Sequence, residues 1–440
     1  MSAETSARQA ALETLMRCRR DGAWSGASLD SSIRRFNLDR RDAAFASRLV
    51  LSVLENASYC DFLIGCYSRG KLEPQVRDIL RLGTAQLLFL DRVPTSAAVN
   101  ESVSLCRRNG RQRAAGLVNA VLRKIADHRS DLPVVPGKGT AEYLSVRYSH
   151  PLWLAQELVE RKGYDFTEAF FAANNKPAPL NLQVNTLKVS ASDYARALAR
   201  TEIPYTVPEE PEGCLLLDGG IAQQLPGFED GLFYVQDRAA RMAVEFVNPA
   251  PGLRVLDACA CPGGKSFAAA VRMGNQGSIL ACDIHEKKLG LLQSGAERLG
   301  IGIIETRAMD ARVFDPELEE AFDLVIADVP CSGFGVIGKK PEIRYKAQEE
   351  IRALPEIQLA ILENLSRYVS PGGTLLYSTC TVLEQENEAV VRAFLAGHPA
   401  FETQAIETRR VSAPSGMYTF WPHVDGTDGF FAANIIKKKQ

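Results

Sequence analysis

Two cysteines follow apolar runs that have the composition of buried β-strands. Asp328-Val329-Pro330-Cys331 comes directly after the run Asp323–Ala327, and Ser378-Thr379-Cys380 comes after Gly373–Tyr377. If these runs are neighbouring strands of an open α/β sheet, both thiols reach the crevice where such sheets bind ligands. A single buried cysteine usually only fills a core. Two thiols at successive strand ends, flanked by polar and turn residues, favour a reactive site.

A glycine turn upstream of the thiols predicts a nucleoside site. A strand over 253–259 runs into Cys259-Ala260-Cys261-Pro262-Gly263-Gly264-Lys265 and then a helix of small residues, and glycines there let backbone approach a ligand at a helix N-terminus. Asp283 ends the next strand, twenty residues after Gly263, where an acid binds ribose hydroxyls. Asp310 ends the following strand and is expected to face the adenine amine.

The spacing of this turn narrows the choice of cofactor. It matches neither Gly-x-Gly-x-x-Gly nor Gly-x-x-x-x-Gly-Lys-Ser/Thr, which disfavours NAD and ATP. S-adenosylmethionine remains, because it needs no phosphate cradle. The alternative is a structural tight turn in an α/β protein, and the two acids, Asp283 and Asp310, make that alternative less favoured.

The residues beside the thiols indicate the reaction. Enzymes that methylate an amine of adenine, cytosine or glutamine typically carry Asn/Asp-Pro-Pro-Tyr/Phe after the fourth strand, whereas this chain has Asp328-Val329-Pro330-Cys331. Methylation of carbon is the remaining option. Carbon 5 of cytosine becomes nucleophilic only after a thiolate adds to carbon 6, so the reaction needs a cysteine, an acid at the N3/N4 edge and a base for the carbon 5 proton. Cys380, Asp328 and Cys331 supply these three types of group.

The elements that position these residues fall into three predicted domains, as expected for 440 residues. Apolar residues recur at helical spacing from Ser6 to about Arg129, with Pro74 and Pro94 at breaks. We expect an all-α domain over 1–130, a Pro/Gly linker over 131–139, a small α+β, RRM-like RNA-binding module over 140–240, and a Rossmann-like domain over 241–440 with a parallel, doubly wound sheet. The expected elements are helices near 151–171 and 191–199, and strands at 180–184, 231–235, 253–259, 278–283, 304–308, 323–328, 373–378 and 430–436.

Charge is unevenly distributed along the chain. The net charge is −2, but residues 1–130 hold 21 Lys and Arg against 13 Asp and Glu. An excess of eight positive charges on the first third predicts contact with phosphate; the alternative is an arginine-rich solvated helical surface. The N-terminus lacks the apolar stretch of a secretory signal, and no run of about eighteen apolar residues predicts a membrane helix. We therefore expect a cytoplasmic protein with reduced thiols, and no cysteine spacing typical of zinc.

These motifs together resemble the RNA (cytosine-5)-methyltransferases, in particular the bacterial 16S rRNA enzymes of the Fmu/Sun (RsmB) family, which join a NusB-like helical domain to a catalytic domain. The resemblance runs nearly end to end. It is carried by Leu72-Glu73-Pro74, Ile79–Gly83, Asp91–Pro94, Ala98–Glu101, Val118–Arg123, Ser149-His150-Pro151, Val184–Leu187, Val235-Gln236-Asp237, the glycine turn, Asp328–Gly335, Ser378–Cys380, Glu386-Asn387-Glu388 and Asp428–Phe431.

The resemblance implies roles for the site residues. Cys380 would be the nucleophile that bonds carbon 6, and Cys331 would assist elimination and release of the methylated base. Cys259, Ala260, Cys261, Pro262, Gly263, Gly264 and Lys265, with Asp283, Asp310 and Asp328, would contact S-adenosylmethionine or the site beside it. Lys265 either reaches the substrate or simply starts a helix. No metal is implied.

Two departures from the family pattern bear on the RNA target. Gln183 stands where the family usually has arginine, and Gly338-Lys339 stands where it usually has two arginines. Lysine lacks the bidentate fork of arginine, so we expect weaker or differently aimed RNA contacts there. The predicted product is 5-methylcytosine in 16S rRNA, on a loop or bulge nucleotide exposed in an assembly intermediate. Another rRNA site or tRNA is one alternative, and a non-catalytic RNA-binding assembly factor is another. We expect a monomer that binds no membrane.

Overall fold

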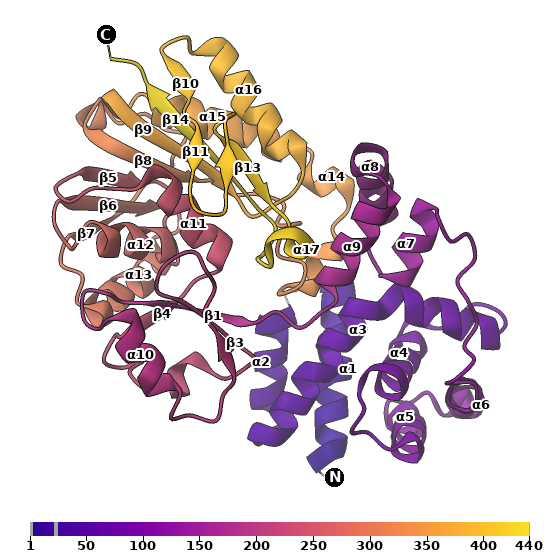
Figure 1. Ribbon diagram of the computed structural model, residues 1–440. Coiled ribbons are helices and arrows are strands. Elements are labelled where there is room, and N and C mark those ends of the chain that lie inside the picture. The colour runs from indigo at the N-terminus through magenta and orange to yellow at the C-terminus, as the bar shows by residue number, and fades with distance from the viewer. Residues whose placement is uncertain (1–2, 22–24, 440) are drawn as a thin grey trace. The chain divides into compact units, whose positions relative to one another are not determined.

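The computed structural model describes residues 3–21 and 25–439, and these fold as two units (Figure 1). The first, here called the helical unit, runs to Lys176 and also contains Lys340–Lys346. The second, the catalytic unit, comprises Pro177–Lys339 and the residues from Ala347 onward. The range 140–240, expected to form one small module, is therefore divided at Lys176, because its helices pack with the N-terminal ones.

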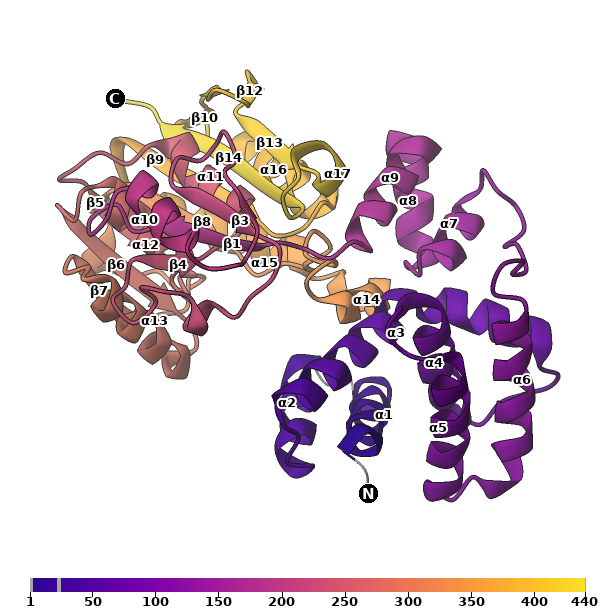
Figure 2. The same ribbon diagram turned by 60° about the horizontal axis from the view of Figure 1, so that its bottom comes forward.

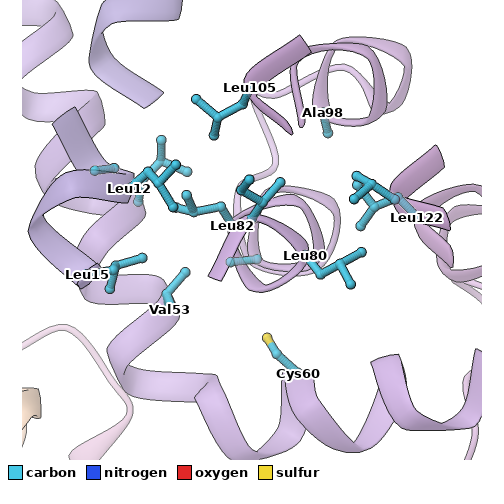
Figure 3. Packing of buried hydrophobic residues seen from close by; sticks show 14 of the residues in the cluster. Leu12, Leu15, Val53, Cys60, Leu80, Leu82, Ala98, Leu105 and Leu122 are labelled. Atoms are coloured by element: carbon cyan, nitrogen blue, oxygen red, sulfur yellow. The ribbon is translucent and has the colours of Figure 1, made fainter. Parts of the chain in front are cut away.

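The helical unit owes its core to apolar residues at three- and four-residue spacing. Figure 3 shows leucines of the fourth helix, α4, between residues of α1 and α3 on one side and α5 and α6 on the other, and Figure 2 shows α4, α5 and α6 side by side. At Gly83 an added Cβ would lie 2.5 Å from a methyl of Leu122, so glycine allows α4 and α6 to approach closely. The helices are α1 (Ala3–Asp21), α2 (Ser25–Arg35), α3 (Arg40–Tyr67), α4 (Pro74–Phe89), α5 (Thr95–Arg108), α6 (Ala115–Asp127), α7 (Ala141–Arg147), α8 (Leu152–Lys162) and α9 (Tyr164–Asn174).

Helix α3 is broken at Asn56, where φ is −132° and ψ is 20°. The break leaves backbone groups without helical partners, and side chains from elsewhere in the unit bond them. Arg344 Nη1 donates to Glu55 O at 2.7 Å and Tyr345 Oη donates to Leu54 O at 2.5 Å. The Lys340–Lys346 segment is thus part of the helical unit because it completes the hydrogen bonding of a broken helix.

By length and composition alone, α3 could cross a membrane, and it is the one helix of the described residues that passes this test. Half of the apolar window is buried inside the protein. Core helices of folded domains pass the same test, so the finding is weak evidence for a membrane span.

The catalytic unit begins with a four-stranded antiparallel sheet in the order β2-β3-β1-β4. Its core contains Leu182, Leu198 and Phe233. The elements are β1 (Leu180–Val184), α10 (Ala191–Leu198), β2 (Tyr205–Thr206), β3 (Cys214–Leu217) and β4 (Phe233–Val235).

An eight-stranded sheet follows, in the order β10-β14-β9-β8-β5-β6-β7, with β13 paired to β14 (Figure 1). Alternate residues of β8 enter opposite cores: Leu324 and Ile326 pack with α11, α12 and α13, whereas Val325 and Ala327 pack with α15 and α16. Helices therefore cover both faces, as in doubly wound folds. The elements are α11 (Arg238–Val247), β5 (Arg254–Asp257), α12 (Gly264–Arg272), β6 (Ser278–Asp283), α13 (Glu286–Leu299), β7 (Ile304–Ala308), β8 (Phe322–Asp328), α14 (Gln348–Ile351), α15 (Leu354–Ser366), β9 (Val369–Thr379), α16 (Glu388–Gly397), β10 (Phe401–Thr403), β11 (Ile406–Glu407), β12 (Ser412–Ala413), β13 (Met417–Phe420), α17 (Pro422–Asp425) and β14 (Phe430–Lys437).

The predicted fold class, a helical domain, a small α+β module and a Rossmann-like domain, is confirmed, with two corrections of detail. Strands β5 to β9 are parallel, but β14 runs antiparallel to β9, so the sheet is mixed. Strand β14 is also antiparallel to its other neighbours, β10 and β13, so it lies among antiparallel pairs at this edge of the sheet. The helix expected over 151–171 is two helices, because Gly163 adopts a φ of 87° between α8 and α9.

Candidate functional site

The site lies where β5, β8 and β9 end together. Strand β8 pairs in parallel with β5 on one side and β9 on the other, with Asp257 opposite Ile326 and Asp328 opposite Ser378. From β5 the chain proceeds through β6 and β7 in one direction and then returns to β8 on the other side of β5. The strand order therefore reverses between β5 and β8, which is where open α/β sheets bind their ligands.

The two predicted thiols meet at this edge. Cys331 Sγ lies 3.1 Å from Cys380 Sγ, and the Cys380 backbone N–H donates to Cys331 Sγ at 3.3 Å. The hydrogen bond with Cys380 and then burial raise the pKa of the Cys331 thiol well above its ordinary value. Cys331 is therefore protonated near neutral pH and can donate to a thiolate at Cys380.

Asp328 is held between two partners beside the thiols. Lys265 Nζ lies 2.6 Å from Asp328 Oδ2, and Ser378 Oγ donates to Asp328 Oδ1 at 2.8 Å. Lys265 is only 7% exposed, and its ammonium lies 4.8 Å from the centre of the Phe430 ring. From the sequence, Lys265 could either contact the substrate or simply start a helix. In the structure it is buried at the site and its ammonium is paired with Asp328, the acid predicted to contact the base.

The glycine turn joins β5 to α12 at the same edge. Gly263 has a φ of 114°, and an added Cβ there would lie 2.6 Å from the Phe267 ring, so glycine is required. The Cys261 N–H donates to Asp283 Oδ2 at 3.3 Å, which brings the predicted ribose acid against the turn. The order of these groups fits an adenosine whose ribose lies over the end of β6.

One acid under the turn has an incomplete hydrogen-bond set. Asp257 is fully buried, and its Oδ2 accepts from Ser266 Oγ at 2.7 Å, but its Oδ1 has no partner among the described residues. Burial raises the pKa of Asp257 to about 7, and Asp328 adds to the rise. A buried carboxylate oxygen without a donor fits a ligand that brings one, such as the ammonium of an amino acid.

The other predicted cofactor residues are also placed by the structure. Asp310 follows β7 and accepts from Arg312 at 2.7 Å, which lowers the pKa of the carboxyl group. Burial raises the pKa of Cys261 to about 11 and that of Cys259 further, so both thiols are protonated. Among residues 3–21 and 25–439, no group of three His, Cys, Asp or Glu side chains is placed to hold a metal ion.

A buried acid that the sequence reasoning did not assign holds the loop that carries Cys331. Glu386 accepts from the Ser332 N–H at 2.8 Å and from Gln358 Nε2 at 2.9 Å. Glu386 stands in the sequence between two other glutamates, Glu384 and Glu388, which are less buried in the structure. Only its burial in the folded protein distinguishes it from them, so the spacing of residues in the sequence gives no signal of this role.

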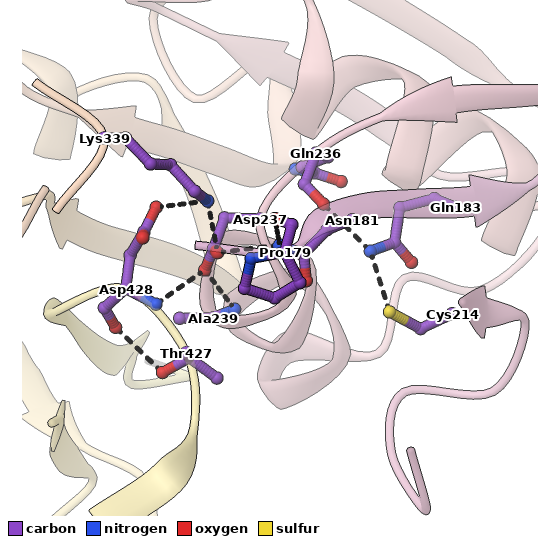
Figure 4. Close-up of polar contacts among 10 residues, drawn as sticks. All are labelled: Pro179, Asn181, Gln183, Cys214, Gln236, Asp237, Ala239, Lys339, Thr427 and Asp428. Carbon is purple, nitrogen blue, oxygen red and sulfur yellow. Dashed lines mark hydrogen bonds and ion pairs between the residues drawn. The ribbon is translucent and has the colours of Figure 1, made fainter. Parts of the chain in front are cut away.

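The two departures noted in the sequence both bond to protein groups (Figure 4). Gln183 is buried in β1, and its Nε2 donates to Gln236 O at 3.0 Å and to Cys214 Sγ at 3.4 Å. Lys339 is paired with Asp237 and Asp428. Sequence reasoning had considered both positions only for contact with RNA.

Comparison with known proteins identifies the family. The family described as 16S rRNA methyltransferase RsmB/F matches residues 244–436, the NusB family matches 5–127, and the RsmF/B-like ferredoxin-like domain matches 150–223. The "Probable ribosomal RNA small subunit methyltransferase B" of Bacillus subtilis is 34% identical over 99% of both chains. The chain belongs to the RsmB/F family of rRNA methyltransferases.

Further RsmB/F relatives agree over the full length. The Synechocystis protein of the same name is 35% identical and covers 98% of this chain and 99% of its own. The crystal structure of PH0851 covers 99% of both chains at 26% identity, with a TM-score of 0.80. The NusB-like domain, the ferredoxin-like module and the methyltransferase domain that the structure shows are therefore those of the RsmB/F family.

Proposed function

We propose that this RsmB/F protein methylates carbon 5 of a cytosine in 16S rRNA, with S-adenosylmethionine as methyl donor and a covalent bond between Cys380 and carbon 6. The observation that carries the proposal is the 3.1 Å contact between two thiols beside Asp328. Amine methylation needs no thiol, whereas carbon 5 becomes nucleophilic only when one adds to the ring.

The arrangement of the thiols supports a division of labour. The Cys380 thiolate bonds carbon 6, and the electron pair of the 5,6 double bond moves toward carbon 5. Asp328 binds the N3/N4 edge of the cytosine, where its negative charge is balanced by Lys265 at 2.6 Å. Carbon 5 would then take the methyl group of S-adenosylmethionine, which would leave as S-adenosylhomocysteine. The carbon 5 proton must next be removed so that Cys380 can leave.

The protonation state of the Cys331 thiol changes during this cycle. Its hydrogen bond with Cys380 is the largest cause of its raised pKa, and that bond weakens once Cys380 has become a thioether. One cause of the raised pKa is then removed. Once Cys331 has released its proton to solvent, its thiolate would accept the carbon 5 proton as the electron pair expels Cys380 as a thiolate, so that one proton is released over the cycle.

The cofactor contacts follow from the turn. Asp283, bonded to the Cys261 N–H, would take the ribose hydroxyls, and the free Oδ1 of Asp257 would take the ammonium. Cys259 to Lys265 would supply the backbone of the pocket. Asp310 would face the adenine amine and would share its carboxylate with Arg312.

The helical unit would bind the RNA. Its match to the NusB family and its excess of arginine support contact with phosphate. Exposed basic side chains gather at the end of α5 and along α6: Arg107, Arg108, Arg113, Arg123 and Lys124. Because the base must leave its stack to reach the thiols, the substrate would be a loop or bulge nucleotide of a small-subunit assembly intermediate in the cytoplasm.

The test is methyl transfer from tritiated S-adenosylmethionine to unmethylated 16S rRNA and, in parallel, to unmethylated tRNA, with mapping of the modified base. Cys380→Ala is expected to abolish transfer, and Cys331→Ala is expected to accumulate a covalent protein–RNA band on a denaturing gel. Cys282→Ala, which removes a buried thiol from β6, is the control and should do neither. Full activity of Cys380→Ala would disprove the mechanism, and 5-methylcytosine formed only in tRNA would disprove the 16S substrate. Failure to bind the cofactor in calorimetry would indicate a non-catalytic assembly factor.

A further inference from the structure

A partly exposed charge cluster lies at the far end of the loop that begins at Cys331. Lys339 Nζ lies 2.8 Å from Asp237 Oδ2 and 2.7 Å from Asp428 Oδ2 (Figure 4). The two acids lie 102 and 89 residues away along the chain. Asp237 is the N-cap of α11, Asp428 lies in the turn before β14, and Lys339 is the last residue of the loop 331–339 in the catalytic unit.

The turn that contains Asp428 also contacts the reactive residues. The Gly429 N–H donates to Gly335 O at 2.8 Å, and the Gly335 N–H donates to Cys380 O at 3.0 Å. The next residue, Phe430, packs on the ammonium of Lys265. A short chain of contacts therefore leads from the charge cluster through the middle of the loop to the backbone of Cys380.

The acids of the cluster are shielded from solvent more than the lysine is. Both aspartate side chains are 13% exposed and Lys339 is 32% exposed. Burial and then Asp237 raise the pKa of Asp428 to about 7, against the opposing effect of Lys339. The ammonium lies between two acids, which weakens its attraction for RNA phosphate.

We propose that Lys339, Asp237 and Asp428 form a clamp that positions loop 331–339 and so keeps Cys331 against Cys380. The three are positioning residues, since they act through the loop and touch neither thiol. The predicted effect on methylation rests on the proposed function, but the position of Cys331 does not.

The distance between the thiols offers a readout that needs no RNA. Diamide oxidises two neighbouring thiols to a disulfide and is itself reduced to the hydrazine, and the yield of the Cys331–Cys380 bond is measured by peptide mapping. We expect Lys339→Met to slow this step about tenfold, because an ångström of misplacement costs up to about a hundredfold in an intramolecular reaction. Lys339→Arg should restore most of the rate, since arginine can bond both acids. Asp428→Asn tests the clamp from the other side and also serves if Lys339→Met does not fold.

A matched control comes from the opposite end of the sheet. Lys437 is 13% exposed, and its Nζ lies 2.8 Å from Glu320 Oε1 and donates to Val369 O. Lys437→Met removes another ammonium that is paired within the catalytic unit and should leave the disulfide rate unchanged. If Lys339→Met and Asp428→Asn, or whichever of the two folds, oxidise as fast as wild type, the clamp is disproved.

Methylation kinetics separate the clamp from an RNA contact. With 16S rRNA we expect Lys339→Met to lower kcat about tenfold and to accumulate the covalent adduct, with KM for RNA unchanged. A raised KM with unchanged kcat and unchanged disulfide rate would instead show that Lys339 binds phosphate, and would overturn the proposal. If wild type forms no 5-methylcytosine but the disulfide rates change as expected, the clamp stands and the proposed function fails.

Discussion

Substitution of Gly335 by alanine should separate the Cys331 loop from the strand that carries Cys380. An added Cβ at Gly335 would lie 1.8 Å from the carbonyl oxygen of Gly429 and 2.9 Å from that of Cys380. Real Cβ atoms do not approach other atoms closer than 3.0 Å, so the loop and the Gly429 turn must move apart by at least 1.2 Å. Both obstacles are backbone atoms and cannot rotate away.

The cost can be worked from the bonds that this movement breaks. Gly335 donates to Cys380 O at 3.0 Å and accepts from Gly429 at 2.8 Å. Two lost hydrogen bonds destabilise the folded state by about 2 kcal/mol, and the buried groups left without partners add about 1–3 kcal/mol. The lower entropy of alanine in the unfolded chain returns up to about 1 kcal/mol. We therefore expect a net loss of about 2–4 kcal/mol and a fall of about a hundredfold in methyl transfer.

The assay is urea denaturation of the full chain together with methyl transfer to 16S rRNA. Gly290→Ala is the control, because Gly290 is exposed in α13 and an added Cβ there meets nothing within 4 Å. That change should raise helix stability by about 1 kcal/mol and leave activity unchanged. If Gly335→Ala keeps both the denaturation midpoint and the rate of wild type, the close packing of loop and turn does not position Cys331.

Two further predictions concern buried ionisable groups. The pKa of Asp257 is raised by burial to about 7. The stability that this group contributes is therefore present below the unfolded pKa of about 4 and lost as pH rises through 7. Urea denaturation without cofactor measures this effect. As pH rises from 4 to 8, the free energy of unfolding of Asp257→Asn should increase relative to that of wild type by up to about 4 kcal/mol. A difference that does not change with pH would contradict the raised pKa. Arg344 donates to Glu55 O and to Asn175 Oδ1 in the helical unit. Arg344→Met should therefore destabilise that unit by about 3 kcal/mol and speed amide hydrogen exchange in α3. Arg123→Met, which removes an exposed arginine, is the control and should do neither.

The sequence predicted that Cys331 and Cys380 lie close together, because the signals for the two strand ends are local. Apolar runs followed by Asp328 and by Ser378 marked the ends of β8 and β9, and the structure places Cys331 and Cys380 in contact there. Parallel pairing of neighbouring strands follows from the alternation of strands and helices. No local signal fixed β14 as antiparallel to β9, because the direction of a strand depends on the whole course of the chain between it and its neighbour and not on the strand itself.

Charge type alone does not show what surrounds Lys339. The sequence predicts weaker or differently aimed RNA contacts there, whereas the partners that the structure gives this lysine lie about a hundred residues away in sequence. These partners are two carboxylates that come from different elements. The pairing of a long charged side chain depends on such distant partners, and no spacing rule within one segment contains them.

The chain that follows Cys331 serves two units in succession. Residues up to Lys339 complete the catalytic unit, and Lys340–Lys346 complete the helical unit before the chain returns at Ala347. Within the helical unit Arg344 and Tyr345 bond the carbonyls exposed by the break in α3, which would otherwise be left without partners. The broken helix therefore requires a segment that the catalytic sequence supplies. Lys339, paired with Asp237 and Asp428, is the last residue of the catalytic unit before the chain enters the helical unit at Lys340. The proposed clamp therefore lies between Cys331 and the point at which the chain passes from one unit to the other.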